Sequence, residues 1–310
     1  MDILTHGLTG GLVGLAVGGR RPAWSVAAAA AGALAPDLDV VARLWDPLAP
    51  LTVHRTATHS LAGGLPLALA GAVALKAVRT PGSLRALVAV GYGGVLSHIA
   101  LDVLNPMGTA VLWPFDSRRF GLGWLYVIDP VVFSVALAGL LIAWRWPALR
   151  APAARRALVT LGVYAVAAGG LSRAAEVEVR RLLAERDRDV VQAVVVPIFP
   201  GPLRWMGVAV TGTGVSRLRF WLGRGDGALR SVVPTTGPRP GPSLDALPAV
   251  RAFRGVARVP VGTVRREADG SVVEYRDLAF EDHPGGGPMA LRLRLDAAGT
   301  VRQVEVGHRF

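Results

Sequence analysis

Histidine and aspartate side chains gather in four short pieces of the first 102 residues, and together they could bind a metal ion. Neutral imidazoles with carboxylates suit zinc, manganese or iron, and several carboxylates allow one ion or two. A bound divalent ion would activate a water molecule for hydrolysis. In two of the pieces the aspartate and the histidine are four residues apart, so a helix would present both on one face. The four pieces are Asp2–His6, Asp37–Asp39, His54–Ser60 and His98–Asp102.

Each piece alone also has an ordinary structural explanation. Asp2 and His6 could be a polar pair at a helix end, the acidic pair could cap a helix, and the pair in His54–Ser60 could lie at the level of lipid headgroups. The last piece is harder to explain in this way, because charged groups at membrane depth are costly. Convergence favours a metal site, with Asp2 as a supporting or additional ligand. The predicted ligands are His6, Asp37, Asp39, His54, His59, His98 and Asp102.

Roles in catalysis follow from the same residue types. A carboxylate that does not bind metal, from among Asp37, Asp39 and Asp102, would serve as general base. The Arg55 guanidinium could hold a substrate phosphate, and the hydroxyl groups of His54–Ser60 would support by hydrogen bonds. The sequence has no cysteine, which excludes thiolate ligands and cysteine nucleophiles, and it lacks the Gly-x-Ser-x-Gly and phosphate-loop patterns.

The elements that must position these residues are apolar segments. The 310 residues are 52% hydrophobic with mean hydropathy +0.42, and 18% are charged, against about 25% in an ordinary soluble domain. Leu125–Trp144 is long enough to cross a bilayer of about 30 Å. We therefore expect residues 1–172 to form an α-helical membrane bundle of about six spans. The six segments are roughly 3–19, 22–36, 59–78, 84–104, 125–144 and 157–172.

The second half of the chain differs from the first in composition. Residues 173–189 are charged and predict a helical connector. Short β-branched runs separated by glycine and proline follow, which is typical of a small, mainly antiparallel β-domain over 190–310. No internal repeat is visible. The runs are 190–196, 208–213, 218–222, 271–275, 291–295 and 301–306.

Charge predicts the orientation of the spans. With six spans, nine basic residues fall on one face and four in the short loops of the other, so the first face should be cytoplasmic. The β-domain would then be extracytoplasmic. All seven acids of residues 1–172 fall on its side, with Asp46, Asp116 and Asp129 as interfacial charges. His283 and His308 are expected to be ordinary surface residues. This distribution of the net charge of +12 favours a lipid bilayer as partner and not nucleic acid.

These motifs also resemble the YdjM family, whose members are described as LexA-regulated inner-membrane metal-dependent hydrolases. The resemblance covers about residues 1–135, and the second half looks like the longer members that carry an extra C-terminal β-domain. It implies metal dependence and hydrolysis in a bacterial inner membrane. The motifs are Met1-Asp2 with Thr5-His6 and Gly10, Pro36-Asp37-x-Asp39, His54-Arg55-x-x-Thr58-His59-Ser60, Ser97-His98-x-x-x-Asp102, Asn105-Pro106-x-Gly108-Thr109 and Trp113-Pro114-Phe115.

Three functions are compatible with these features. The first is a multi-pass membrane hydrolase, with zinc as the favoured metal, acting on a phosphoester or lipid-linked substrate at the extracytoplasmic face. The phosphoester preference rests on a likeness of motif style to zinc-dependent phospholipases C. The second is a transporter or metal-handling protein that uses the same histidines and aspartates. The third is a structural anchor for an external β-domain, which would leave the buried histidines and aspartates without a role.

Overall fold

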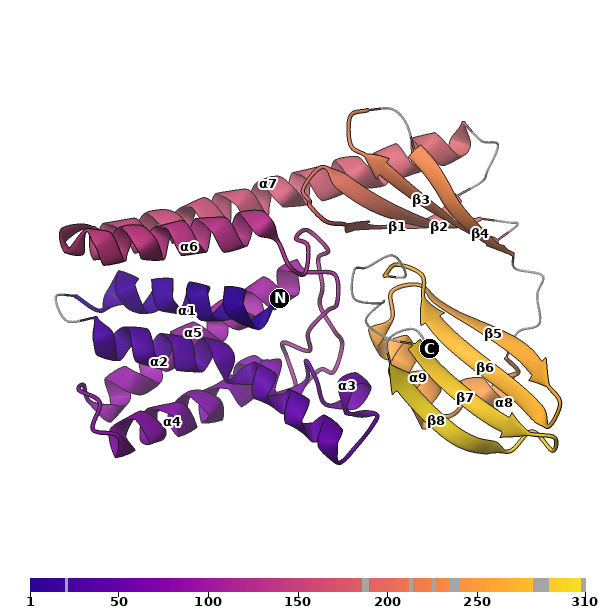
Figure 1. Cartoon of the computed structure of the whole chain (residues 1–310), viewed down its shortest axis with the longest axis horizontal. Coiled ribbons are helices and arrows are strands. Elements are labelled where there is room, and N and C mark those ends of the chain that lie inside the picture. Colours follow the sequence, from indigo (N-terminus) through magenta and orange to yellow (C-terminus); the bar gives the residue numbers. More distant parts are fainter. Residues whose placement is uncertain are drawn as a thin grey trace. The chain divides into compact units, whose positions relative to one another are not determined.

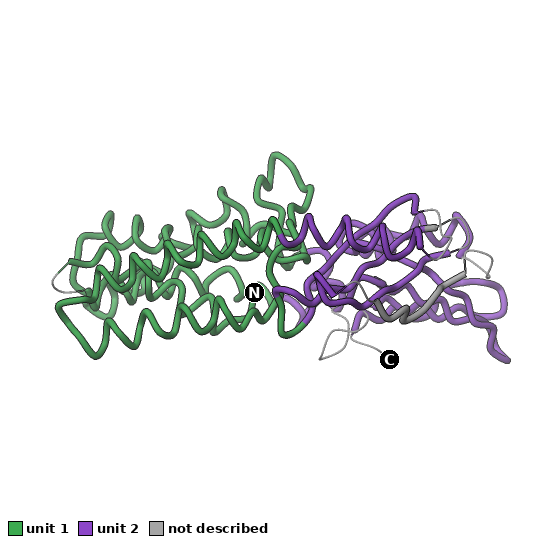
Figure 2. Tube along the Cα trace, turned by 90° about the horizontal axis from the view of Figure 1, so that it is seen from above, with its two compact units in different colours: residues 1–41, 53–170, 199–201 green, residues 42–52, 171–198, 202–310 purple. Residues whose placement is uncertain are grey.

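The computed structural model describes residues 1–19, 22–185, 190–211, 214–224, 227–234, 240–280 and 290–307. These residues form two compact units (Figures 1 and 2). The first unit comprises residues 1–41, 53–170 and 199–201, and the second comprises 42–52, 171–198 and 202–310. Every residue predicted to bind metal belongs to the first unit. Arg20, Arg21, His283 and His308 lie outside the described residues.

The first unit is helical, and its long helices coincide with the apolar segments of the sequence. Serine side chains cap the beginnings of two helices: α4, which follows His59, and α5, which carries His98. The Ser60 hydroxyl accepts a hydrogen bond from the Gly63 amide where α4 begins, and Ser83 does the same for Ala86 at the start of α5. The elements are α1 (Ile3–Val17), α2 (Ala23–Leu34), η1 (Pro36–Leu44), η2 (Ala57–His59), α4 (Leu61–Ala77), α5 (Leu84–Leu104), α6 (Pro130–Arg145), η3 (Pro147–Leu149) and α7 (Arg150–Ala184).

Two of the described helical stretches are long and apolar enough to cross a membrane, namely α5 and the stretch Pro147–Ala184. Two bent pairs pass the same test if each is one broken span: α2 with η1, and Ala49–His59 with α4. Helices α1 and α6 are apolar but shorter, with 15 and 16 residues. The described residues therefore contain two to four candidate spans, and the count of six stays a prediction.

Glycine lets α2 lie very close to α5. A Cβ atom at Gly94 would lie 2.0 Å from the carbonyl oxygen of Ala29, and one at Gly32 would lie 1.9 Å from that of Gly91. Any larger residue at these points would push the helices apart, as at the small-residue contacts of membrane helices. This contact holds the acidic pair that follows α2 against the helix that carries the fourth His/Asp piece.

The second unit contains two four-stranded antiparallel sheets, in which consecutive strands are neighbours. The predicted antiparallel β-structure of the C-terminal half is confirmed. Helix α7 continues without a break from the sixth apolar segment through the predicted connector as far as Ala184. The elements are α3 (Ala49–Thr52), β1 (Val190–Pro197), β2 (Arg204–Thr211), β3 (Gly214–Trp221), β4 (Gly227–Pro234), α8 (Pro242–Asp245), α9 (Pro248–Val256), β5 (Pro260–Glu267), β6 (Gly270–Asp277), β7 (Ala290–Asp296) and β8 (Val301–Gly307).

Each sheet of the second unit is preceded in the chain by a helix that packs against it. Leu183 of α7 shares a buried core with Trp205 and Phe220 of the first sheet. Phe253 of α9 shares another with Tyr275 of the second sheet. The unit thus repeats one arrangement, a helix followed by a four-stranded meander, which the sequence does not reveal.

Asp129 departs from the prediction of an interfacial charge, since its side chain is buried. It begins α6 by accepting hydrogen bonds from the backbone amides of Val131, at 2.9 Å, and Val132, at 3.1 Å. The Tyr164 hydroxyl of α7 donates to its other oxygen at 3.0 Å. One carboxylate therefore caps α6 and joins it to α7.

Replacing Asp129 with alanine removes this cap and leaves the Tyr164 hydroxyl without its acceptor. We expect Asp129→Ala to lower the free energy of unfolding by about 1–3 kcal/mol, measured by denaturant titration in detergent. Asp116→Ala is the control, because Asp116 pairs with the exposed Arg118, and it should leave the midpoint unchanged. Equal midpoints for wild type and Asp129→Ala would contradict this role.

Candidate metal centre

The four His/Asp pieces meet in the first unit and form one cluster. Their potential ligand atoms make three overlapping groups, and within each group the atoms lie within 4.8 Å of one another. The seven predicted ligands therefore all lie in one place, although the sequence separates the first from the last by 96 residues. The groups are His6 with His98 and Asp102, Asp37 with His59 and His98, and Asp39 with His54 and His59.

Four atoms at the centre have the spacing of a four-ligand metal site. The Nε2 atom of His59 lies 3.3 Å from Oδ1 of Asp37 and 3.6 Å from Oδ2 of Asp102. The Nε2 atom of His98 lies 3.7 Å and 3.5 Å from the same two oxygens. Ligand atoms about 2.0–2.1 Å from a tetrahedral zinc ion lie about 3.3–3.4 Å from one another. We call these four side chains the central group.

Three of these atoms have no hydrogen-bond partner. The side chains of His59, His98 and Asp102 are completely buried, and the two Nε2 atoms and Oδ2 of Asp102 remain unpaired. Buried polar atoms in native proteins almost always have a partner, because leaving them unpaired costs free energy. A divalent cation would satisfy all three at once. The buried cluster could therefore hold a metal ion.

In both His59 and His98, the Nδ1 atom has a partner outside the central group, and this contact orients the ring. Nδ1 of His98 lies 2.7 Å from the carbonyl oxygen of Ala33. Nδ1 of His59 lies 2.9 Å from the Thr58 hydroxyl and 3.3 Å from a carboxylate oxygen of Asp39. Metal-binding histidines have such partners on the nitrogen that does not face the metal. Both Nε2 atoms are therefore the ones that face the centre.

Asp102 is oriented by a closed set of hydrogen bonds. Its Oδ1 accepts from Arg55 at 3.1 Å and from the Asn105 amide at 3.0 Å, and Arg55 also donates to the Asn105 side-chain oxygen at 3.0 Å. The other oxygen of Asp102, Oδ2, faces His59 and His98. The Arg55 guanidinium is buried in these contacts, and its contact with a substrate phosphate stays a prediction.

His54 and Asp39 form a pair at the edge of the cluster. Nδ1 of His54 lies 2.7 Å from Oδ1 of Asp39, and the His54 side chain is 30% exposed. The Thr58 hydroxyl donates to the other oxygen of Asp39 at 2.6 Å. Asp39 therefore lies behind the His59 ring, on its Nδ1 side, and holds two histidines and a hydroxyl together.

His6 lies on the other side of Asp102. Its ring stacks on that of His98 with centroids 3.6 Å apart, and its Nε2 is 3.4 Å from Oδ1 of Asp102. The amine of Met1 bonds to both His6 and Asp102. Asp2 caps α1 through the amide and hydroxyl of Thr5, which is the ordinary structural explanation for that residue.

The sequence alone did not assign Asn105 or Arg119 a contact in the cluster. Asn105 is the C-cap of α5, three residues after Asp102, and it begins one of the motifs quoted above, which was a signal for it. Arg119 donates from Nη2 to the carbonyl oxygen of His54 at 2.8 Å. This contact joins residues 65 positions apart, and no local pattern distinguishes Arg119 from its neighbour Arg118.

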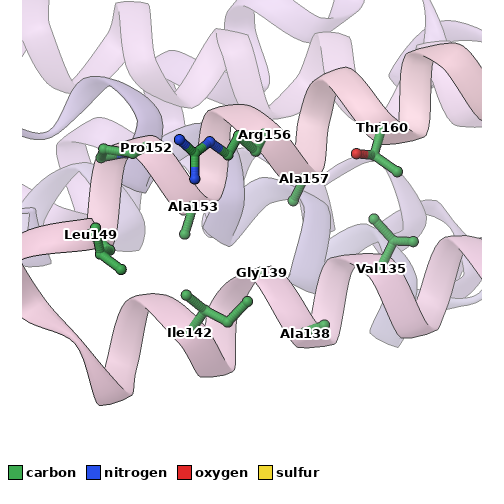
Figure 3. Close-up of a pocket in the computed structure, with 10 residues that line it drawn as sticks. All are labelled: Val135, Ala138, Gly139, Ile142, Leu149, Pro152, Ala153, Arg156, Ala157 and Thr160. Atoms are coloured by element: carbon green, nitrogen blue, oxygen red, sulfur yellow. The ribbon is translucent and has the colours of Figure 1, made fainter.

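Within the described ranges, every group of three or more potential metal-binding side chains belongs to this cluster. A groove of about 250 Å³ between α6 and α7, shown in Figure 3, has a different character. It is lined mainly by apolar and small side chains such as Gly139 and Ala157, with Arg156 its charged residue. It offers no carboxylate or imidazole for chemistry.

Comparisons with known proteins agree with the motifs. Residues 1–176 match the family model described as YdjM inner membrane protein. The chain is also similar to the uncharacterized protein YfhP of Bacillus subtilis (strain 168), with 26% identity over 333 aligned positions that cover 100% of this chain and 96% of that protein. No solved structure matches the chain.

The geometry distinguishes the central group from the side chains around it, and metal content tests whether this group holds the ion. We expect His59→Ala, His98→Ala and Asp102→Asn each to reduce bound metal well below the wild-type stoichiometry, because each removes an atom of the central group. His54→Ala should keep its metal, since His54 contributes no atom to the central group. Elemental analysis of purified protein measures the ratio. Unchanged stoichiometry in both His98→Ala and Asp102→Asn would contradict the assignment.

Proposed function

The chain belongs to the YdjM family of inner membrane proteins, and on that premise we propose that it is an integral membrane metal-dependent hydrolase. The observation that carries the proposal is the central group, in which three buried polar atoms lack partners beside a fourth donor at ligand spacing. A structural role alone does not account for so many unpaired atoms in one place. All the clustered groups lie together, whereas a transport path requires sites along its length.

Zinc is the favoured metal. Two imidazole nitrogens and two carboxylate oxygens are its usual donors in proteins, and four of them suit its tetrahedral geometry. A bound divalent ion supplies an acidic water and polarises a phosphoryl oxygen. Asp102 would hold the ion through Oδ2 while Arg55 and Asn105 keep its other oxygen in place. A second ion beside His6 would have to replace the Met1 amine, which bonds to both His6 and Asp102.

Proton transfer is assigned to His54 and Asp39. His54 is the partly exposed histidine of the cluster, and Asp39 holds its Nδ1. Its Nε2 would take the proton from the attacking water and return it to the leaving oxygen, as the bond from phosphorus to that oxygen breaks. Asp37 belongs to the central group, so it would hold the ion and take no part in this proton transfer.

A phosphoester in or attached to a lipid is the proposed substrate class. Leu38 and Val41, beside the acidic pair on η1, are 65% and 44% exposed, and Phe115 in the loop after α5 is 90% exposed. Large apolar side chains exposed next to a polar site are typical of a surface that contacts lipid or an apolar ligand. They support a substrate that carries an apolar part.

An extracytoplasmic site is proposed from charge. Of the nine basic residues on the predicted cytoplasmic face, seven lie within the described residues and Arg20 and Arg21 lie outside them. An alkaline phosphatase fused after Phe310 should be active, and one fused in the loop between α4 and α5 should be inactive. The reverse pattern would place the cluster on the cytoplasmic side.

Activity should depend on metal and on His54 in separable ways. We expect removal of metal by a chelator to reduce hydrolysis of a chromogenic phosphodiester to background, and added zinc to restore it. We expect His54→Ala to lower kcat by about 10²- to 10⁴-fold with metal still bound. Asp116→Asn, outside the cluster, should match the wild type. Full activity of the chelated, metal-free protein would contradict the proposal.

A further inference from the structure

A pocket of the first unit lies at the opposite end of α5 from the His/Asp cluster. Its volume is about 880 Å³, within the range of ligand sites in proteins. The beginning of α2, the turn between α4 and α5, and Arg150 at the beginning of α7 line it, and these helix ends lie at the left of Figure 1. His98 and Asp102 lie in the last two turns of α5, and the pocket shares no residue with their cluster.

The pocket lies at the level where the candidate membrane spans begin or end. Two of the described stretches are long and apolar enough to be spans on their own, and they begin at Leu84 and Pro147. The two bent pairs have an end here as well, at Ala23 and Ala77. Pocket-lining residues lie within three positions of each of these four ends. Ends of spans lie among lipid headgroups, so the pocket is at headgroup level on whichever side of the membrane this end faces.

Basic side chains gather at this end of the first unit without acids to neutralise them. Residues 3–35, 60–101 and 130–172 contain no aspartate or glutamate. A surface with uncompensated positive charge at headgroup level attracts anionic lipids. The basic residues in the described part of these three stretches are Lys76, Arg79, Arg85, Arg145, Arg150, Arg155 and Arg156.

Two of these arginines line the pocket, and the described part of the chain offers no partner to either. Arg79 and Arg150 make no hydrogen bond or ion pair within it. Lys76, by contrast, donates to two carbonyl oxygens of the turn, at 3.1 and 3.4 Å. Arg155 donates to the carbonyl oxygen of Ala16. The guanidinium groups in the pocket therefore have donors available for a ligand.

The turn that carries Arg79 is held in one conformation. Arg79 follows the C-cap of α4 with a φ of +59°, a left-handed conformation in which glycine is usual after a helix and arginine has a steric cost. The Lys76 amine bonds across the turn. Gly82 lies against the Trp24 indole, since a Cβ at residue 82 would be 3.3 Å from the ring. The turn therefore fixes where the Arg79 side chain leaves the backbone.

We propose that this pocket binds the headgroup of an anionic phospholipid, whose phosphate Arg79 and Arg150 hold. A guanidinium fork matches two oxygens of a phosphate, and basic pockets between membrane helices are typical sites for anionic headgroups. Trp24 and Val78 offer apolar surface to the part of the lipid next to the phosphate. No acidic residue is among the described residues that line the pocket. The inference goes beyond the proposed hydrolase function, and either can fail without the other.

Tryptophans at the same level favour a lipid over a soluble phosphate compound. Trp144 and Trp146 directly precede the span that begins at Pro147, and their side chains are 76% and 51% exposed. The Arg145 guanidinium lies 5.4 Å from the centre of the Trp146 ring. Exposed tryptophan is typical of the boundary between membrane and water. A phospholipid is therefore the phosphate compound that surrounds the pocket.

Native mass spectrometry of the full-length protein in detergent tests the proposal, with phosphatidylglycerol as the probe. We expect Arg79→Gln and Arg150→Gln each to weaken its binding by about 10-fold, because each removes a charge-assisted contact with the phosphate. Arg79→Lys keeps the charge and should recover part of the loss. Phosphatidylcholine, which has no net charge, should bind more weakly than phosphatidylglycerol to the wild type and equally to all variants.

Arg85 provides the matched control. It lies at the beginning of α5, its side chain is exposed, and it does not line the pocket. Arg85→Gln removes the same charge from the same end of the unit, and it should bind phosphatidylglycerol like the wild type. An equal loss of affinity in Arg85→Gln would show that net charge alone attracts the lipid, and it would overturn the inference.

Three further results would overturn the inference. The first is wild-type affinity for phosphatidylglycerol in both Arg79→Gln and Arg150→Gln. The second is a lower melting temperature of both variants in lipid-free detergent, which would assign the arginines a structural role. The third is binding of glycerol phosphate as tightly as phosphatidylglycerol, which would identify a soluble ligand. Bound metal should be equal in all variants and the wild type, because the pocket and the cluster share no residue.

Discussion

A completely buried carboxylate, that of Asp102, is the constraint on which the rest of the cluster depends. A charge without access to water needs partners on both oxygens. Arg55 and Asn105 supply them on one side, and the unpaired Nε2 atoms of His59 and His98 face the other. A divalent cation at this point would satisfy Oδ2 of Asp102 and both Nε2 atoms at once.

Close helix packing makes this arrangement possible. Because Gly94 allows α2 to touch α5, the carbonyl of Ala33 can orient His98, and the first turn of η1 reaches the central group. The loop after α5 then folds back so that Arg119 rests on the segment that carries His54. The side chains of the cluster thus come from different elements that the same few helix contacts hold together.

The sequence predicted the helices and the convergence of the pieces well, because long apolar runs and the spacing of His98 and Asp102 are local signals. It could not predict which side chains orient which, since the contact of Arg55 with Asp102 joins residues 47 positions apart. The change in composition near residue 172 marks no break in secondary structure. Alanine, leucine, glutamate and arginine favour helix on both sides of it, and α7 is continuous there. Strand β5 was missed because its arginines and glycine interrupt the β-branched pattern.

X-ray absorption spectroscopy of the zinc-loaded protein tests the central claim most directly, because it counts the ligands of the ion itself. The account predicts nitrogen and oxygen neighbours at about 2.0–2.1 Å, with the outer-shell signal of two imidazoles per ion. That signal should fall to one imidazole in any residual zinc bound by His98→Ala and remain at two in His54→Ala. A wild-type spectrum without imidazole scattering, or one unchanged by His98→Ala, would contradict it.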